Sequence, residues 1–109
     1  MMNEVYLQGV VDALQPTDAP RQLVCRLCVS HHNRQGDVRH EYYSIWLWNG
    51  LAAWAESSLR PGMPVMIKGY LTQYSLQGRW QTAVTARRIW AGQAHRTDEP
   101  AEHELALPG

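Results

Sequence analysis

The sequence predicts an all-β domain, a closed barrel of five strands with one short helix between the third and fourth strands. Apolar and polar residues alternate over five stretches, which is the period of a strand with one buried face. One further stretch, residues 50–59, repeats its apolar residues at helical spacing instead. The chain has 109 residues, of which 45% are hydrophobic, so it is long enough for one core and too short for two.

The first two strands are expected at Glu4–Val11 and Leu23–Val29. Gly9 falls inside the first alternating stretch and suggests a sharp bend or a bulge there. Residues 12–21 include two prolines, which end strand pairing, so this segment is expected to form the connecting loop.

The third strand is expected at Glu41–Trp48, after an exposed hairpin loop at residues 30–40. The loop is polar, contains a glycine and carries the cations Arg34 and Arg39. Alternation within the strand separates a core-facing set from an outward set. Tyr43, Ile45 and Leu47 are expected inside, and Tyr42, Trp46 and Trp48 outside.

The helix at residues 50–59 is predicted to begin after Asn49, a residue type that often caps helices. Trp54 lies on its apolar side and is expected to face the core. The Arg60–Gly62 segment contains a proline and a glycine and is expected to end the helix.

A fourth strand is expected at Val65–Tyr74, and a turn at residues 76–79 leads into a fifth strand, Trp80–Trp90. Val65, Ile67, Gly69 and Leu71 are expected inside the fourth strand. Five strands with one helix between the third and fourth form the element order of the five-stranded Greek-key barrel called the OB-fold.

The barrel domain is expected to span residues 1–91. Residues 92–109 are polar and aperiodic, which indicates a mobile tail. No run of about 18 apolar residues and no basic segment followed by an apolar one occurs, so neither a membrane span nor a signal peptide is predicted. We therefore expect a cytoplasmic protein without a membrane partner.

Charge alone gives no argument for a polyanionic partner, because ten Lys and Arg residues balance ten Asp and Glu residues. The charges are unevenly spread, however. Residues 1–91 hold nine of the ten basic side chains and six acids, so the body is mildly basic. The other four acids lie near the end of the chain: Asp98, Glu99, Glu102 and Glu104.

The spacing of Cys25 and Cys28 resembles a redox pair or half of a zinc site, with His31 and His32 following. Residues three apart on a strand point to opposite faces, however, so the two thiols are not expected to chelate together. We expect no metal and no other cofactor.

The aromatic residues carry the functional prediction, since the chain has five Trp, five Tyr and no Phe. Trp and Tyr suit half-exposed surfaces, and rings interleaved with cations on one sheet are typical of single-strand nucleic-acid binding. A subunit interface would use the same residue types. The predicted binding residues are Tyr42, Trp46, Trp48, Lys68, Tyr70, Tyr74, Arg79 and Trp80, with Arg34 and Arg39 in the loop before the third strand.

Enzyme activity is not expected, and no catalytic residue is assigned. No nucleophile beside a base, no phosphate-binding glycine loop and no paired carboxylates occur in the sequence. His31, His32 and Asp37 are interpreted as a solvated loop.

The segment His40–Leu71, HEYYSIWLWNGLAAWAESSLRPGMPVMIKGYL, resembles the bacterial single-stranded DNA-binding protein family, whose members follow T-E-W-H-R-V-V-L-F-G-K-L-A-E at this spacing. The opening Met2–Val10 and the segment Trp80–Val84 extend the resemblance over about residues 2 to 90. The family implies an OB-fold and a role in DNA replication, recombination or repair.

By position, the resemblance implies that Tyr42 and Trp48 replace the family's base-stacking Trp and Phe on the third strand. Trp80 occupies the aromatic site at the start of the last strand. Two departures are present. Tyr43 stands where the family has a His near subunit contacts, so the usual tetramer is not implied, and the ending ELALPG lacks the family's acidic tip with a terminal Phe.

A related family, the primosomal replication protein of restart primosomes, is also a short OB domain without the tail, and it is dimeric. It is the alternative, along with an OB-type module that binds another protein through the aromatic face. We expect single-stranded DNA as the partner, a homo-oligomer (dimer or tetramer), and replication or restart proteins as further partners.

Overall fold

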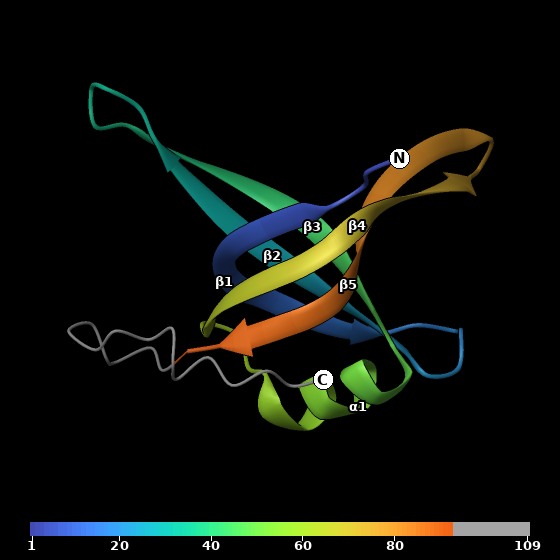
Figure 1. The fold of residues 1–109 in the computed structure, drawn as a ribbon. Coiled ribbons are helices and arrows are strands. Elements are labelled where there is room, and N and C mark those ends of the chain that lie inside the picture. The colour runs from blue at the N-terminus through green and yellow to red at the C-terminus, as the bar shows by residue number, and fades with distance from the viewer. Residues whose placement is uncertain (93–109) are drawn as a thin grey trace.

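In the computed structural model, which describes residues 1–92, five strands close into a barrel with one helix at its end (Figure 1). Hydrogen-bonded strands follow the order β1-β2-β3-β5-β4, and β4 pairs with β1 to close the sheet. Only β3 and β5 run parallel. The elements are β1 (Val5–Pro16), β2 (Gln22–His32), β3 (Val38–Trp48), α1 (Asn49–Ser58), β4 (Pro64–Leu76) and β5 (Arg79–Ala91). The predicted OB-type barrel is confirmed.

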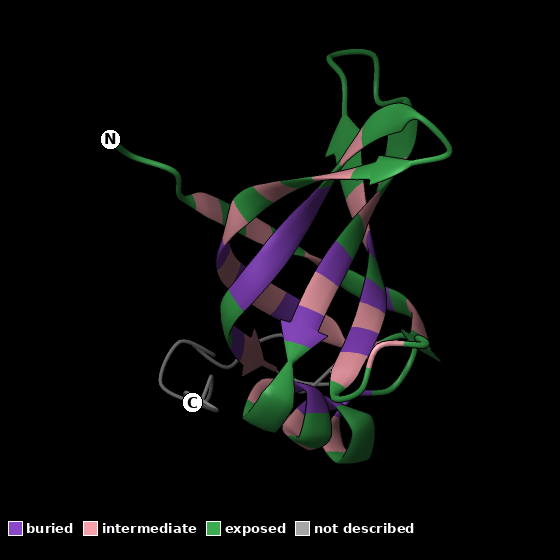
Figure 2. Ribbon diagram, turned by 90° about the vertical axis from the view of Figure 1, so that its right-hand side faces the viewer, coloured by how far each residue is buried: buried purple, intermediate pink, exposed green. Residues whose placement is uncertain are grey.

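The core consists of aliphatic side chains from every strand, because the inner positions of each strand recur every second residue. Figure 2 shows these buried bands in the middle of the barrel. Fully buried members include Val11, Leu27, Ile45, Ile67 and Ile89.

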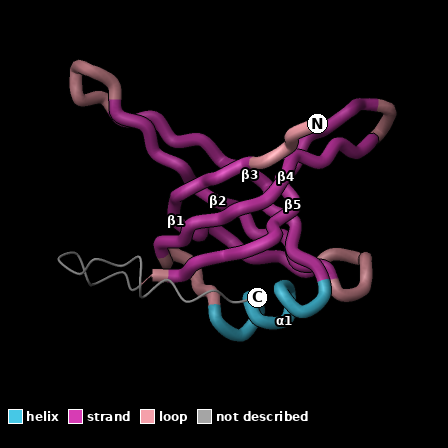
Figure 3. Tube along the Cα trace, in the orientation of Figure 1, coloured by secondary structure: helices cyan, strands magenta, loops and turns pink. Residues whose placement is uncertain are grey.

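Helix α1 covers one end of the barrel (Figure 3). Ala52 and Ala55 are buried, and Trp54 packs against the core, as expected. Asn49 is not the N-cap: Trp48 occupies that position, and no side chain caps the helix. Asn49 instead has a positive φ of 56°, and its backbone N–H donates to the carbonyl oxygen of Arg21 at 2.8 Å. The helix start is therefore held by a contact between distant segments.

The first strand is longer than predicted, because the expected loop at residues 12–21 begins only after Pro16. A bulge between Val11 and Ala13 interrupts the alternation at Asp12, which hides the continuation of the strand from the sequence pattern. The bulge is not at Gly9. A Cβ on Gly9 would collide with the carbonyl oxygen of Cys28, so this glycine permits close approach of β1 and β2.

Two hairpins project beyond the barrel at the end away from α1 (Figure 1). The expected loop at residues 30–40 is mostly strand, and only residues 33–37 form the turn. Both faces of a projecting hairpin are solvated, so its strands need no apolar alternation. The β4–β5 hairpin turns at Gln77 and Gly78, as predicted, with both φ values positive. Leu71, expected inside, is exposed, because it lies beyond Gly69, where the pairing of β4 with β1 ends.

The tail predicted at residues 92–109 lies outside the described residues, apart from residue 92. In the part of the chain that the structure describes, no helix has the length and apolar character needed to span a membrane.

Candidate nucleic-acid interface

Aromatic rings gather on the outer surface of β3, β5 and β4. Trp46 and Trp48 project from the same side of β3 and meet edge to face, with ring centroids 6.4 Å apart. Trp46 also contacts Tyr74 of β4, at a centroid distance of 4.8 Å. Tyr70 of β4 is linked to Trp46 through Thr85, which pairs with both in the sheet. We call Trp46, Trp48, Tyr70 and Tyr74 the aromatic face.

Small residues on the central strand allow these rings to meet. β5 lies between β3 and β4, and its outward side chains there are Ala83 and Thr85. Both are almost covered, with 3% and 7% of their surface exposed. The Thr85 hydroxyl also shares a 2.6 Å hydrogen bond with that of Thr72. The large side chains of the flanking strands therefore lie over the middle strand and cover it.

Tyr42 shares the outward side of β3 but has different neighbours. Its ring is 52% exposed, and the Arg26 guanidinium lies 4.9 Å from the ring centroid. Arg26 is held by Asp12 at 2.8 Å. The nearby Cys28 is the main cause that raises the pKa of Tyr42 above its ordinary value.

Lys68 lies in a different row of the outer surface, opposite Tyr6 of β1 and Arg88 of β5. Its ammonium is 5.7 Å from the centroid of Tyr6. The structure therefore places Lys68 beside the aromatic face rather than within it.

The two predicted residues in the β4–β5 turn lie apart from the aromatic face. Trp80 is 72% exposed. It pairs with Ser75 of β4, whereas Tyr74 pairs with Gln81, the residue after Trp80 in β5. Alternation therefore turns Trp80 to the opposite side of the hairpin from Tyr74. Arg79 is exposed at the start of the same strand.

Arg34 and Arg39 belong to the β2–β3 hairpin. Arg34 is exposed in its turn. Arg39 lies on the opposite side of β3 from Tyr42 and forms a 3.0 Å ion pair with Glu41. Glu41 also accepts hydrogen bonds from Tyr43 and His31, and chiefly the Tyr43 bond lowers its pKa. Arg39 is thus partly neutralised.

The structure adds three residues that the sequence reasoning missed: Tyr6, Arg87 and Arg88. Arg26 is not among them, because Asp12 already pairs with its charge. Arg87 lies over Tyr70, with its guanidinium 4.8 Å from the ring centroid. The adjacent basic residues at 87 and 88 were a visible signal in the sequence. The bulge that turns both outward was not, because it depends on pairing with β4.

The two cysteines lie on opposite sides of β2, as expected. Cys25 is fully buried, and burial, with a smaller effect of Asp12, raises the pKa of its thiol to about 12. The Cys28 sulfur lies on the outer side, 3.7 Å from Nδ1 of His40. No metal-binding group of three His, Cys, Asp or Glu residues occurs among residues 1–92.

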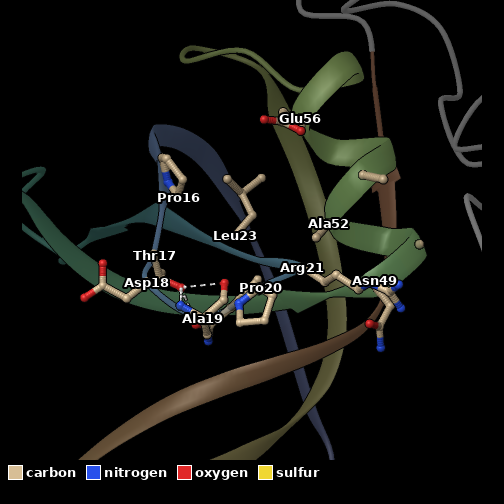
Figure 4. A pocket seen from close by; sticks show the side chains of 13 residues that line it. Pro16, Thr17, Asp18, Ala19, Pro20, Arg21, Leu23, Asn49, Ala52 and Glu56 are labelled. Carbon is tan, nitrogen blue, oxygen red and sulfur yellow. Dashed lines mark hydrogen bonds between the residues drawn. The ribbon is translucent and has the colours of Figure 1, made fainter.

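A hollow of about 610 Å³ lies at the α1 end of the barrel, between the β1–β2 loop and the helix (Figure 4). Asp18, Arg21 and Glu56 are its charged residues, and prolines and alanines form much of the rest. None of the predicted binding residues lines it. The candidate interface is therefore the open aromatic face and not this hollow.

A profile of the single-strand binding protein family matches residues 2–97. The chain belongs to this family. Its members are binding proteins rather than enzymes, so the expectation of no catalytic activity holds. A comparison with curated proteins found no match.

Solved structures with the same fold include small single-stranded DNA-binding proteins of Mycoplasma pneumoniae (18% identity, TM-score 0.68) and Streptomyces coelicolor (21%, 0.68). The alignments cover 91% and 89% of this chain and 98% and 99% of those chains. A deletion mutant of the Thermus aquaticus single-stranded DNA-binding protein aligns at 21% identity and TM-score 0.66, over 86% of this chain and 52% of that chain.

Proposed function

We propose that this family member binds single-stranded DNA largely independently of sequence, by stacking bases on its aromatic face. The observation that carries the proposal is the set of Trp46, Trp48, Tyr70 and Tyr74 on one outer sheet surface, where the Trp46 ring lies next to those of Trp48 and Tyr74. Base stacking on such rings contributes about 1–3 kcal/mol per base and tolerates any sequence, because every base has a flat face. The family match and the names of the structural neighbours support the same ligand.

Cations around the rings would hold the phosphates. Lys68 and Arg87 lie beside the aromatic face, and Arg34 and Arg79 lie on the two hairpins. Tyr42 would extend the path of the strand toward the β2–β3 hairpin. Trp80 lies on the other side of the β4–β5 hairpin from Tyr74, so only a strand that passes around that hairpin would reach it. Arg39 would contribute less, because Glu41 already pairs with it.

The expected setting is the cytoplasm, in DNA replication, recombination or repair, where unpaired strands form. A homo-oligomer is expected, since Tyr and Trp residues such as those of the outer surface are also frequent at subunit interfaces. A dimer would favour the restart-primosome alternative, and a tetramer would favour the main family. Sedimentation velocity of the full chain distinguishes these two assemblies.

Titration with oligothymidylate tests the proposal directly, because four of the five tryptophans lie outside the barrel core, at Trp46, Trp48, Trp80 and Trp90. We expect strong quenching of tryptophan fluorescence at low salt and weaker binding as salt rises, since phosphate contacts release counterions. A duplex of the same length is the control, because its bases are already stacked. Absence of quenching at micromolar protein and low salt would refute the proposal.

The protein-interaction alternative makes the opposite prediction. In that case, replacing Trp48 and Tyr42 with Ala would abolish capture of a protein partner, and the unmodified chain would show no measurable affinity for DNA.

A further inference from the structure

A bulge in β5 turns two consecutive arginines to the outer surface. Lys68 pairs with Arg88 and Gly69 pairs with Ala86, so Arg87 has no partner across the strands. Ala86 and Ile89 are buried on either side, whereas Arg87 and Arg88 are both exposed. In a regular strand, one of two adjacent side chains would point into the barrel.

Gly69 on the facing strand makes this bulge possible. A Cβ at this position would collide with the backbone carbonyl oxygen of Thr85. The close approach of β4 and β5 at the bulge therefore requires a residue without a side chain, and it places Arg87 directly over its neighbour Tyr70.

Three cations meet at this place. Lys68 and Arg88 face each other directly across β4 and β5, a like-charge pairing that destabilises a sheet. Among the described residues, no ion pair involves Lys68, Arg87 or Arg88. Two tyrosine rings, Tyr6 and Tyr70, lie against these cations. We call these five residues the bulge cluster.

The Tyr42 site has the same contact between a guanidinium and a tyrosine ring, but there an acid neutralises the arginine. Arg26 lies over Tyr42 at 4.9 Å, almost the distance at which Arg87 lies over Tyr70. Arg26, however, is paired with Asp12, whereas no such acid faces Arg87 within residues 1–92. The two sites differ in their net charge and not in their ring geometry.

We propose that the bulge cluster is a phosphate-binding subsite, at which Arg87, Arg88 and Lys68 hold consecutive phosphates while a base stacks near Tyr70. This inference rests on the proposed function and extends the DNA path from the aromatic face across β4 toward β1. Tyr70 joins the two, because it is paired through Thr85 with Trp46.

A polyanion fits this patch better than a second copy of the chain does. A contact centred on the cluster about a twofold axis would bring its three cations against the same three cations of the partner. A phosphate backbone, in contrast, neutralises all three and removes the repulsion between Lys68 and Arg88.

The test compares Arg87→Gln with Arg26→Gln in the full chain, with binding to oligothymidylate measured over a range of salt concentrations. Each phosphate contact to a single strand contributes about 0.7 to the slope of log affinity against log salt. We expect Arg87→Gln to reduce the slope by about 0.7 and affinity at low salt by about tenfold. The triple change of Lys68, Arg87 and Arg88 to Gln should reduce the slope by about 2. Arg26→Gln, the matched control, should leave the slope unchanged.

The outcomes separate this inference from the proposed function. One outcome is that the unmodified chain binds oligothymidylate with the same salt slope and affinity as Arg87→Gln. In that case the proposed phosphate subsite is wrong, and binding by the aromatic face is retained. If Arg26→Gln lost as much affinity and salt slope as Arg87→Gln, the subsite proposal would also be wrong, because any exposed cation would then contribute equally to binding. A change in sedimenting mass with an unchanged slope would assign the cluster to contact between copies of the chain. If the unmodified chain does not bind, the proposed function itself fails.

Discussion

The inner and outer faces of the same five strands are built from different residue types. The buried positions hold Val, Leu, Ile, Ala, one Cys, Gly69 and Thr85, while none of the ten Trp and Tyr residues is fully buried. Aliphatic side chains fill a narrow barrel at high density, and rings on the outside remain available for stacking. Stability and binding therefore depend on separate residues of one sheet, and changes on one face should leave the property of the other face intact.

The two thiols of β2 provide the largest contrast. The raised pKa of Cys25, about 12 against an ordinary 9.0, leaves about a thousandfold less thiolate than an ordinary thiol has at the same pH. We expect a thiol reagent to modify Cys28 in the folded protein and Cys25 only after denaturation. Counting modified thiols with and without denaturant checks this. Two rapidly reacting thiols in the native protein would mean that the inner face is open.

Truncation of the inner face should affect stability alone. Ile45 is fully buried on β3, so Ile45→Ala should lower the free energy of unfolding by about 2–5 kcal/mol. Denaturant unfolding measures the loss. DNA affinity of the molecules that remain folded should be unchanged, and a parallel loss of affinity would contradict the separation of the two faces.

Removal of an outer ring should have the opposite effect. Trp48→Ala should weaken oligothymidylate binding by about 1–3 kcal/mol. The free energy of unfolding should change less than in Ile45→Ala, because Trp48 does not belong to the buried core. Trp48→Tyr keeps a ring at this position and should retain most of the affinity. A large shift of the unfolding midpoint in Trp48→Ala would show that this ring serves the core.

The smallest effect is expected at Glu41, on the projecting hairpin. The hydrogen bond from Tyr43, with His31 and Arg39, lowers the pKa of Glu41 below its ordinary 4.5 in the folded state. The resulting stabilisation is present above pH 4.5 and is lost as the pH falls through the lowered pKa. Melting temperatures of Glu41→Gln should therefore fall less steeply below pH 4.5 than those of the unmodified chain. Parallel curves would contradict this.

The projecting hairpins explain the limits of the sequence-based strand boundaries. Alternation located Ile45 and Leu47 correctly, because one side of the barrel wall must be apolar. It missed the strand ends at His32 and Val38, where solvent lies on both sides and selects no pattern.

The sequence by itself determined which side of each strand of the barrel wall is apolar and which side carries the rings, because a period of two along a strand depends only on the order of residues. Tertiary structure alone decided which exposed residues are neighbours. Trp46 meets Tyr74 across β5, and Arg87 reaches Tyr70 at a bulge, through pairings between strands that are distant in the chain. Register between such strands depends on the packing of the whole barrel, and no local pattern encodes it.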